Sequence, residues 1–435
     1  MSLTQIAKQP HVDSYYAATA NDAMPYPSLT EDIRCDVCVV GGGLTGVSTA
    51  LNLAEKGYKV VLLEAARIGW AASGRNGGQM IYGFASGMDE FAKYMPEADV
   101  QKVWQMGQYS LDIIKRRVAQ HQIDCDLKTG YFHAANKPRH VAEHKAWQEE
   151  AATRFGYDRF EYVDKAGLGR FIQSDAYLGG LYDPDSGHLH PLNYNLGLAR
   201  AATAAGAHLF EGSEVTALEM SDQPGGQHLL KTGQGSVKAS FVVLACNAYI
   251  GKLSPALARK IMPVGTYVIT TEPMNAERCQ ALMPAHAAIC DSRFVLDYFR
   301  TTADNRMLWG GKVSYSKMAP RDLPNAMRVD MLKVFPQLAD LKVEHAWGGF
   351  CDITMSRAPH FGRLAPSVYF AQGFSGHGVN VTGLAGELMA DAIAGQAERF
   401  DLFGKLKHQD FPGGDLLRTP ALVLAMAWFR LKDYL

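Results

Sequence analysis

The pattern of apolar and polar positions predicts a strand, a turn, a helix and a second strand within residues 35–66. The first apolar run, Cys35–Val40, leads directly into a glycine-rich turn. An Ala- and Leu-rich stretch follows and ends near Gly57, a residue type that often ends helices because it adopts positive φ freely. A second apolar run, Lys59–Leu63, ends at the acidic Glu64. This order is typical of a β-α-β unit in a parallel sheet.

Further stretches have the apolar spacing of helices or the β-branched composition of strands. Helices are predicted over residues 97–121, 193–206 and 379–394, with a short apolar helix at Ala421–Leu435. Strands are predicted at 208–211, as a pair at Ser236–Leu244 and Met262–Thr271, and at Phe294–Arg300 and Met307–Lys312 around a turn at Ala303–Asn305.

The nucleotide-type segments recur at the start, middle and end of the chain, so we expect two domains that are interleaved rather than consecutive. The predicted fold class is α/β: a Rossmann-type dinucleotide-binding domain with an interleaved α+β substrate domain built on a large mixed sheet. The predicted divisions are an N-terminal arm (1–34), the dinucleotide-binding domain (35–96, 185–255 and 345–404), the substrate domain (97–184 and 256–344) and a C-terminal extension (405–435).

Composition narrows the class of protein. The chain has 435 residues, 20% of them charged, and a formal net charge of -1, so no electrostatic footprint for nucleic acid is visible. The sequence shows neither a signal peptide nor an apolar run of spanning length, so we expect a cytoplasmic enzyme with no stable membrane insertion. The helix predicted at Ala421–Leu435 is expected to pack on the protein. Seven irregularly spaced cysteines argue against a disulfide framework, and the Cys35-x-x-Cys38 pair is interpreted as core.

The glycine turn matches the dinucleotide-binding fingerprint G-x-G-x-x-G. Gly41 permits the tight turn, Gly43 lets the backbone approach a pyrophosphate, and Gly46 lets the helix sit close to the strand. The helix N-terminus then offers free N–H groups and a positive dipole to the phosphates. The carboxylate of Glu64 is placed to hold ribose hydroxyls.

Two later segments favour FAD over NAD. The small-residue loop Gly69–Gln79 can lie against a flat ring, and its Ser73, Arg75 and Asn76 can donate hydrogen bonds to the cofactor. The second segment is a strand, a glycine loop and a helix over Tyr369–Asn380, which would stabilise negative charge on a reduced flavin. The fingerprint occurs once, so a separate NAD(P)H site is not evident.

With these motifs the chain resembles the D-amino-acid-oxidase-like superfamily of flavin amine oxidoreductases, and within it the enzymes of γ-glutamyl-polyamine breakdown. The resemblance spans nearly the whole length. It is carried by segments 14–21, 35–46, 64–69, 72–79, 187–193, 246–249, 296–298, 302–306, 373–378 and 411–414.

The resemblance implies an FAD-dependent oxidase that acts on the free amine of a γ-glutamylated, γ-glutamylputrescine-like polyamine, with oxygen as electron acceptor. The products would be an aldehyde, ammonia and hydrogen peroxide. An FAD-dependent amino-acid oxidase or dehydrogenase that passes electrons to a quinone is the alternative, and a non-catalytic FAD-binding or tRNA-modifying scaffold is a third possibility.

The predicted FAD-binding residues come from the three glycine-rich segments and two connecting strands. They are Gly41, Gly43, Leu44, Thr45, Gly46, Glu64, Ala65, Arg67, Ala72, Ser73, Arg75, Asn76, Gly77, Gly78, Gln79, Val215, Asn247, Gly376, His377, Gly378 and Val379. FAD is expected to be non-covalent, although one branch of the superfamily attaches flavin to a cysteine near the position of Cys351. The same branch has a lysine that activates oxygen. Its approximate position in this chain is that of Leu308, and Lys312 is close by in the sequence.

The candidate catalytic residues are His377, Tyr298 and Arg300. His377 and Tyr298 are expected to line the flavin face. The alternatives carry equal weight: His377 is a loop histidine that only fixes the backbone, and Tyr298 is an aromatic residue of the sheet. Arg300, or Arg75, is a candidate to meet the carboxylate of a γ-glutamyl group. No metal site is expected, because His188 and His190 have no third ligand spaced near them.

Overall fold

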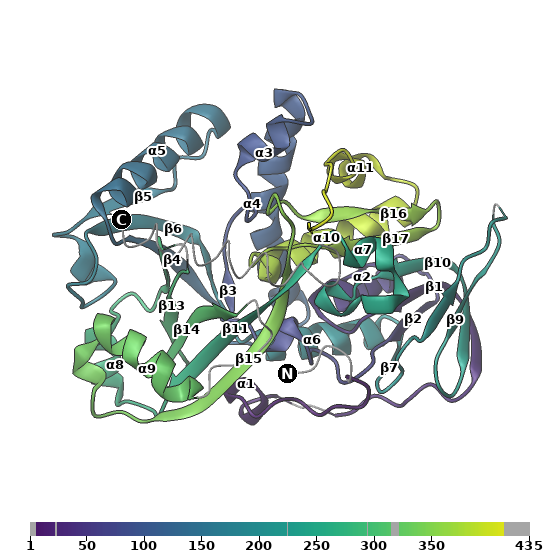
Figure 1. The fold of residues 1–435 in the computed structure, drawn as a ribbon, viewed down its shortest axis with the longest axis horizontal. Coiled ribbons are helices and arrows are strands. Elements are labelled where there is room, and N and C mark those ends of the chain that lie inside the picture. Colours follow the sequence, from purple (N-terminus) through teal and green to yellow (C-terminus); the bar gives the residue numbers. More distant parts are fainter. Residues whose placement is uncertain (1–5, 22–23, 224, 294, 315–321, 413–435) are drawn as a thin grey trace.

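The computed structural model describes residues 6–21, 24–223, 225–293, 295–314 and 322–412, which form two large β-sheets flanked by helices. Figure 1 shows sheet A on the right and sheet B on the left, with helices beside both sheets. The predicted fold class, a Rossmann-type unit with a second, mixed sheet, is confirmed.

The predicted strand-turn-helix-strand unit lies at the centre of sheet A. Strand β1 (Asp32–Val40) runs parallel to both of its neighbours, β2 (Val60–Leu63) and β10 (Ser236–Leu244). Among the described residues the sheet has eight strands, ordered β16-β17-β10-β1-β2-β7, with β9 paired to β10 and β8 to β9. The other strands are β7 (His208–Phe210), β8 (Ala217–Glu219), β9 (His228–Lys231), β16 (His360–Ala365) and β17 (Val368–Gln372).

Both faces of sheet A are buried, which explains why its strands are continuous apolar runs. Val37 and Val39 pack against the helices on one face, whereas Cys38 and Val40 join a second cluster that includes residues from 250–261. The helices on the first face are α2 (Leu44–Glu55), α6 (Pro191–Ala204) and α10 (Gly378–Ile393), and α4 (Glu97–Gln120) packs on α10.

Sheet B is mostly antiparallel and has nine strands within the described ranges, ordered β15-β11-β14-β13-β12-β4-β6-β3, with β5 paired to β6. Its only parallel pair there is β4 with β12. The strands are β3 (Gln79–Met80), β4 (Lys128–Ala135), β5 (Glu161–Asp164), β6 (Gly179–His188), β11 (Met262–Thr271), β12 (Ala288–Asp291), β13 (Tyr298–Thr301), β14 (Met307–Ser314) and β15 (Val343–Ile353).

One face of sheet B packs on helices α8 (Ala276–Leu282) and α9 (Leu323–Val334). Trp309 and Phe299 are fully buried there and stack with ring centroids 4.7 Å apart. Strand alternation places Tyr131 and Tyr298 on the opposite face, which is turned toward sheet A. The remaining helices are α1 (Tyr15–Ala18), α3 (Met88–Ala92), α5 (Pro138–Phe155), α7 (Pro255–Ala258) and α11 (Glu398–Gly404).

Most predicted elements are confirmed, with two corrections. The strands at 236–244 and 262–271 both form, but they belong to different sheets and do not pair, because β10 bonds to β1 and β11 to β15 and β14. The strand expected from residue 294 begins only at Tyr298, and just before it the Asp297 N–H donates to the Asp291 carboxylate. The helix expected at Ala421–Leu435 lies outside the described residues.

The division into domains stays a prediction, and the position of one strand bears on it. Strand β15, within a segment assigned to the dinucleotide-binding domain, forms the edge of sheet B. Cys35 and Cys38 are buried free thiols, as expected of core residues. Within the described residues, no helix combines the length and hydropathy needed to cross a membrane.

Trp309→Ala should lower the free energy of unfolding by about 3–5 kcal/mol, because it leaves a cavity at a fully buried site between sheet B and α9. Urea denaturation followed by circular dichroism measures the change. Val329→Ala on the same helix is the control, since Val329 is exposed. Equal losses in the two variants would contradict this view of the core.

Candidate functional site

A cavity of about 990 Å³ lies between the two sheets, at the large end of the range for small-molecule sites. Val40 and Leu63 line it from sheet A, and Tyr131 and Tyr298 line it from sheet B. It begins where β1 and β2 end, the edge at which parallel sheets bind ligands.

The glycine turn after β1 is too crowded for side chains. A Cβ on Gly46 would lie 1.9 Å from the carbonyl oxygen of Gly41, and one on Gly41 would lie 2.6 Å from the oxygen of Ala245. Gly41 also has φ +110°, where an L side chain is strained. The glycines at 41 and 46 therefore allow helix α2 to start directly against the strand ends.

Glu64 and Ser73 hold this turn in place. Glu64 accepts hydrogen bonds from the Gly42 N–H at 2.6 Å and the Ala66 N–H at 2.8 Å. Burial raises the pKa of its carboxyl, and these two N–H donors oppose the shift. The Ser73 hydroxyl accepts a bond from the Leu44 N–H at 2.9 Å. Glu64 and Ser73 both line the cavity, so each can serve the turn and a ligand together.

The loop at 69–79 is tied to the rest of the protein by two buried arginines. Arg75 donates through Nε to the Trp70 carbonyl at 2.6 Å and lies over the Trp70 ring. Arg300 donates to the carbonyls of Gly77 and Leu189 and to the Tyr16 hydroxyl. Neither arginine lines the cavity. The hydrogen bonds of the two arginines position the loop, and the expectation that one of them meets a substrate carboxylate stays a prediction.

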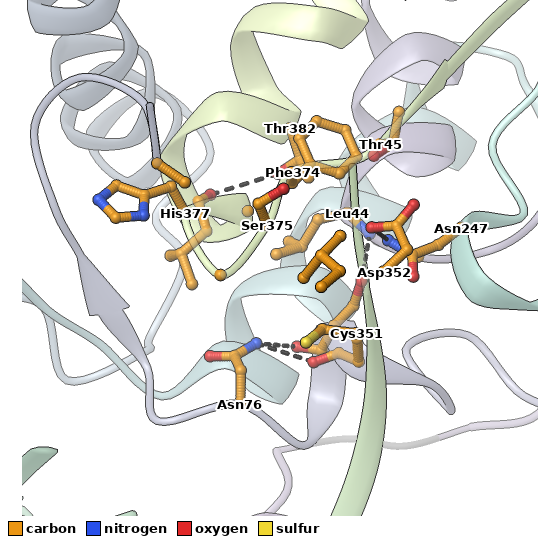
Figure 2. Close-up of a pocket in the computed structure, with 18 of the residues that line it drawn as sticks. Leu44, Thr45, Asn76, Asn247, Cys351, Asp352, Phe374, Ser375, His377 and Thr382 are labelled. Atoms are coloured by element: carbon orange, nitrogen blue, oxygen red, sulfur yellow. Dashed lines mark hydrogen bonds between the residues drawn. The ribbon is translucent and has the colours of Figure 1, made fainter. Parts of the chain in front are cut away.

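The second glycine loop joins sheet A to helix α10 on the other side of the cavity. Asp352 accepts bonds from the Gly373 N–H at 2.6 Å and from the Asn247 side-chain amide at 2.9 Å. Burial raises the pKa of Asp352 to about 6, against the effect of these donors. Figure 2 shows Asn247 and Asp352 together on one side of the pocket and His377 on the opposite side.

Two helices therefore begin at this cavity. Gly43 precedes α2 and His377 precedes α10, and neither of these two residues caps its helix with a side chain; on α2 the Ser73 hydroxyl takes the N–H of the first residue, Leu44. The first residues of both helices line the cavity. Uncapped N–H groups and the helix dipole favour an anionic or hydrogen-bond-accepting ligand at each point. Two such ends at one elongated cavity fit a diphosphate at α2 and a polar ring edge at α10.

Tyr298, His133 and Cys290 on sheet B, and His377 in the loop before α10, are polar groups of the cavity that carry no charge near pH 7. Burial lowers the pKa of His377 and of His133 to about 4, so both imidazoles are neutral near pH 7. Burial raises the pKa values of Tyr298 and Cys290 far above neutrality. These groups can donate or accept hydrogen bonds, but none of them is poised to titrate near pH 7.

The structure brings most of the predicted site residues together. The ones that line the cavity are Gly41, Gly43, Leu44, Thr45, Glu64, Ala65, Ala72, Ser73, Asn76, Gly77, Gln79, Val215, Asn247, Gly376, His377, Gly378, Val379 and Tyr298. Gly46 and Gly78 shape the backbone beside it. Arg67 forms an ion pair with Glu211 at 2.7 Å and does not line it.

Several cavity residues were not found from the sequence. Asp352 could have been noticed as the one acid in an apolar stretch, but nothing in its neighbourhood connects it to Gly373. Tyr131, His133 and Cys290 lie on strands that the sequence analysis did not identify. The aromatic residues Trp147 and Phe155 at the outer end of the cavity were also missed, because helix α5, which carries both, was not predicted.

The remaining candidates have structural contacts. His190 caps α6 by accepting a bond from the Asn193 N–H, and His188 contacts the His286 carbonyl. Within the described ranges, no three metal-ligating side chains converge. Trp70 and Tyr249 line the cavity with their rings in a T-shaped arrangement, whereas Trp347 donates to the Arg75 carbonyl.

Comparisons with known proteins agree with this geometry. The family described as "DAO: FAD dependent oxidoreductase" matches residues 36–392. The chain is 42% identical to the gamma-glutamylputrescine oxidoreductase of Escherichia coli, over 98% of this chain and 99% of that protein. It is 41% identical to a probable oxidoreductase OrdL of Haemophilus influenzae, over 99% of both. Among solved structures, glycine oxidase from Geobacillus kaustophilus has a TM-score of 0.71 at 20% identity, over 86% of this chain and 99% of that one.

Gly46→Ala should abolish cofactor retention, because the added methyl group would overlap the Gly41 carbonyl and push the tip of α2 away from the turn. We expect a protein that purifies without yellow colour and binds added FAD at least about 100-fold more weakly. Flavin absorbance and titration measure this. Gly404→Ala is the control, since a Cβ there meets open space. A yellow Gly46→Ala protein of normal affinity would exclude the assigned role of the turn.

Proposed function

The chain belongs to the DAO family of FAD-dependent oxidoreductases, and we propose that it oxidises the free primary amine of a γ-glutamylated polyamine. The family makes FAD the cofactor. Full-length similarity to gamma-glutamylputrescine oxidoreductase supports the substrate class. The predicted resemblance to this family is confirmed by the same comparisons.

The residues that would hold FAD follow from the cavity. The turn at Gly41–Gly46 and the N-terminus of α2 would bind the diphosphate, and Glu64 would bind ribose hydroxyls. Ser73, Asn76 and the loop at Gly376–Val379 would contact the flavin half. When bound there, FAD supplies the two-electron acceptor that amine oxidation requires.

Among the described residues, no guanidinium from β4, β12 or β13 lines the cavity, and this is the observation that carries the proposal. An α-amino acid has a carboxylate beside the carbon that is oxidised, and such a group needs a nearby cation. Among the described residues, the cations that line the cavity are Lys252, Lys312 and Arg357, and none comes from β4, β12 or β13. Lys312 is moreover paired with Asp330 at 2.5 Å. The site therefore suits an amine that lacks a carboxylate on the reacting carbon.

The reaction balances with oxygen and water as co-reactants. The R–CH₂–NH₂ group loses two electrons and two protons to become an imine, and water then adds and releases ammonia to leave the aldehyde. Oxygen takes the two electrons and two protons to become hydrogen peroxide. The cavity residues contribute by orienting the amine and excluding bulk water from it.

The protein assists deprotonation of the amine mainly through its environment. A primary amine has a pKa near about 10 in water, and burial among neutral groups favours its neutral form. His377 and Tyr298 stay uncharged near pH 7 and can accept or donate a hydrogen bond to the amine. We assign them a positioning role at the substrate.

FAD is proposed to be non-covalent. Cys351 lines the cavity, but burial raises the pKa of its thiol to about 12. A covalent bond to flavin needs the thiolate, which is scarce at such a pKa. Acid precipitation should therefore release the flavin into the supernatant.

Anaerobic mixing tests the substrate class. We expect γ-glutamylputrescine to bleach the flavin band, with putrescine, spermidine and D- and L-amino acids much slower, because putrescine and spermidine lack the γ-glutamyl group and amino acids carry a carboxylate on the reacting carbon. In aerated buffer each turnover should yield one hydrogen peroxide. Bleaching by amino acids alone would refute the proposal, and bleaching without peroxide would favour a quinone or another acceptor.

The pH profile tests the roles of His377 and Tyr298. Because neither titrates between pH 6 and 8, kcat/KM should rise about tenfold per pH unit there, following the neutral fraction of the substrate amine. His377→Asn should keep the same slope at a lower level. A plateau with a midpoint near pH 7 that disappears in His377→Asn would instead identify His377 as the base.

A further inference from the structure

The cavity continues beyond the proposed flavin region to an aromatic mouth. Its rings come from the loop after β3, from α4, from α5 and from the segment before β5. The rings that define the aromatic mouth are Tyr82, Trp104, Trp147, Phe155 and Phe160. Such an assembly of rings at the entrance offers several electron-rich faces to a ligand.

The rings pack against one another and lead back to the reacting end. Trp104 stacks on Phe155 with centroids 4.2 Å apart, and Tyr82 lies 4.6 Å from Phe160. The Trp147 ring is 5.4 Å from that of His133, which lines the cavity on sheet B. Trp147 is also 40% exposed, so the mouth is reached from solvent.

A carboxylate lies within this aromatic surface. Trp147, Glu150, Ala151 and Phe155 occupy one stripe of α5 at helical spacing, and all four line the cavity. The Glu150 side chain is 44% exposed and forms an ion pair with Arg154 at 2.8 Å. Glu150 is thus the acidic group of the mouth, presented between two aromatic side chains of the same helix.

The surroundings of Glu150 have more negative than positive charge. Arg154 is shared among three carboxylates, since it also pairs with Asp89 and with Glu97. Behind the rings, buried Asp183 accepts a bond from the Tyr157 hydroxyl at 2.8 Å. Burial, and then the charges of Asp183 and Glu150, raise the pKa of Tyr82.

The nearby cations are occupied or lie outside the cavity. Arg159 pairs with Asp185, Lys115 lies 3.9 Å from Asp185, and Lys145 lies over the ring of Tyr162. None of these three side chains lines the cavity. The mouth therefore combines aromatic faces, a carboxylate and an excess of negative charge, which is the chemistry that recognises an ammonium group.

We propose that the aromatic mouth binds a second ammonium group at the far end of the substrate, so that the enzyme selects linear amines with a cation distant from the reacting amine. The inference rests on the proposed function, in which the other end of the same molecule is oxidised. In γ-glutamylputrescine this group is the α-ammonium of the glutamyl moiety, held by Glu150 and the faces of Trp147 and Trp104.

Two analogues separate the charges at the far end of the substrate. N-(4-aminobutyl)glutaramate keeps the carboxylate but lacks the α-ammonium, and the 4-aminobutanoyl amide of putrescine keeps the ammonium but lacks the carboxylate. Anaerobic flavin reduction at varied amine concentration gives the apparent Kd and the limiting rate for each. The variants are Glu150→Gln and, as control, Glu149→Gln, whose side chain is exposed on the same helix and outside the cavity.

We expect Glu150→Gln to raise the apparent Kd about tenfold for both ammonium-bearing amines, to change it by less than about twofold for the glutaramate, and to leave the limiting rate unchanged. Glu149→Gln should behave as wild type. If Glu150→Gln weakens the binding of all three amines equally, or changes the apparent Kd of none, the inference is overturned. In that case bleaching of the wild-type enzyme by γ-glutamylputrescine still upholds the proposed function. Failure of all three amines to bleach the wild-type enzyme would overturn both. Flavin content and thermal melting confirm that each variant is folded.

Discussion

The buried carboxylate of Asp352 connects segments that are distant in the sequence and surround the functional cavity. It lies on β15 of sheet B and accepts bonds from Asn247, after β10, and from Gly373, after β17, both of which follow strands of sheet A. The Ser375 N–H also bonds to the Asp352 carbonyl. Burial raises the free-energy cost of ionising a carboxylic acid, so the oxygens of Asp352 need these hydrogen-bond donors. This one group therefore sets how the two sheets meet along the cavity.

The two ends of the cavity differ in charge, and in the proposed reaction this difference decides which end of the substrate is oxidised. Near His377 and Tyr298 the walls are neutral and buried, which favours an uncharged amine. At the aromatic mouth, Glu150 is partly exposed and the surrounding acids outnumber the bases. A diamine-like substrate entering a cavity of this kind has a physical reason to keep its outer nitrogen charged and to lose the proton from its inner one.

The sequence predicted local features well and interactions between distant residues poorly. The glycine turn, Glu64 and helix α10 were predicted because their neighbours in sequence specify them. The bonds of Arg300 to Gly77, Leu189 and Tyr16 were not predicted, because the need for buried carbonyl partners around the loop becomes visible only in the folded chain. The pairing of residues 236–244 with 262–271 failed because strand propensity does not determine which sheet a strand joins.

By itself the sequence determined the Rossmann unit, since G-x-G-x-x-G and an acid at the end of the next strand are requirements of backbone geometry within about thirty residues. It also indicated the family. Only the tertiary structure decided which polar side chains face the cavity, which ones brace its walls, and that α5 contributes a carboxylate between aromatic rings at the mouth. The physical reason is that burial, hydrogen-bond partners and local charge depend on segments far apart in the chain, and no spacing along the sequence encodes their meeting.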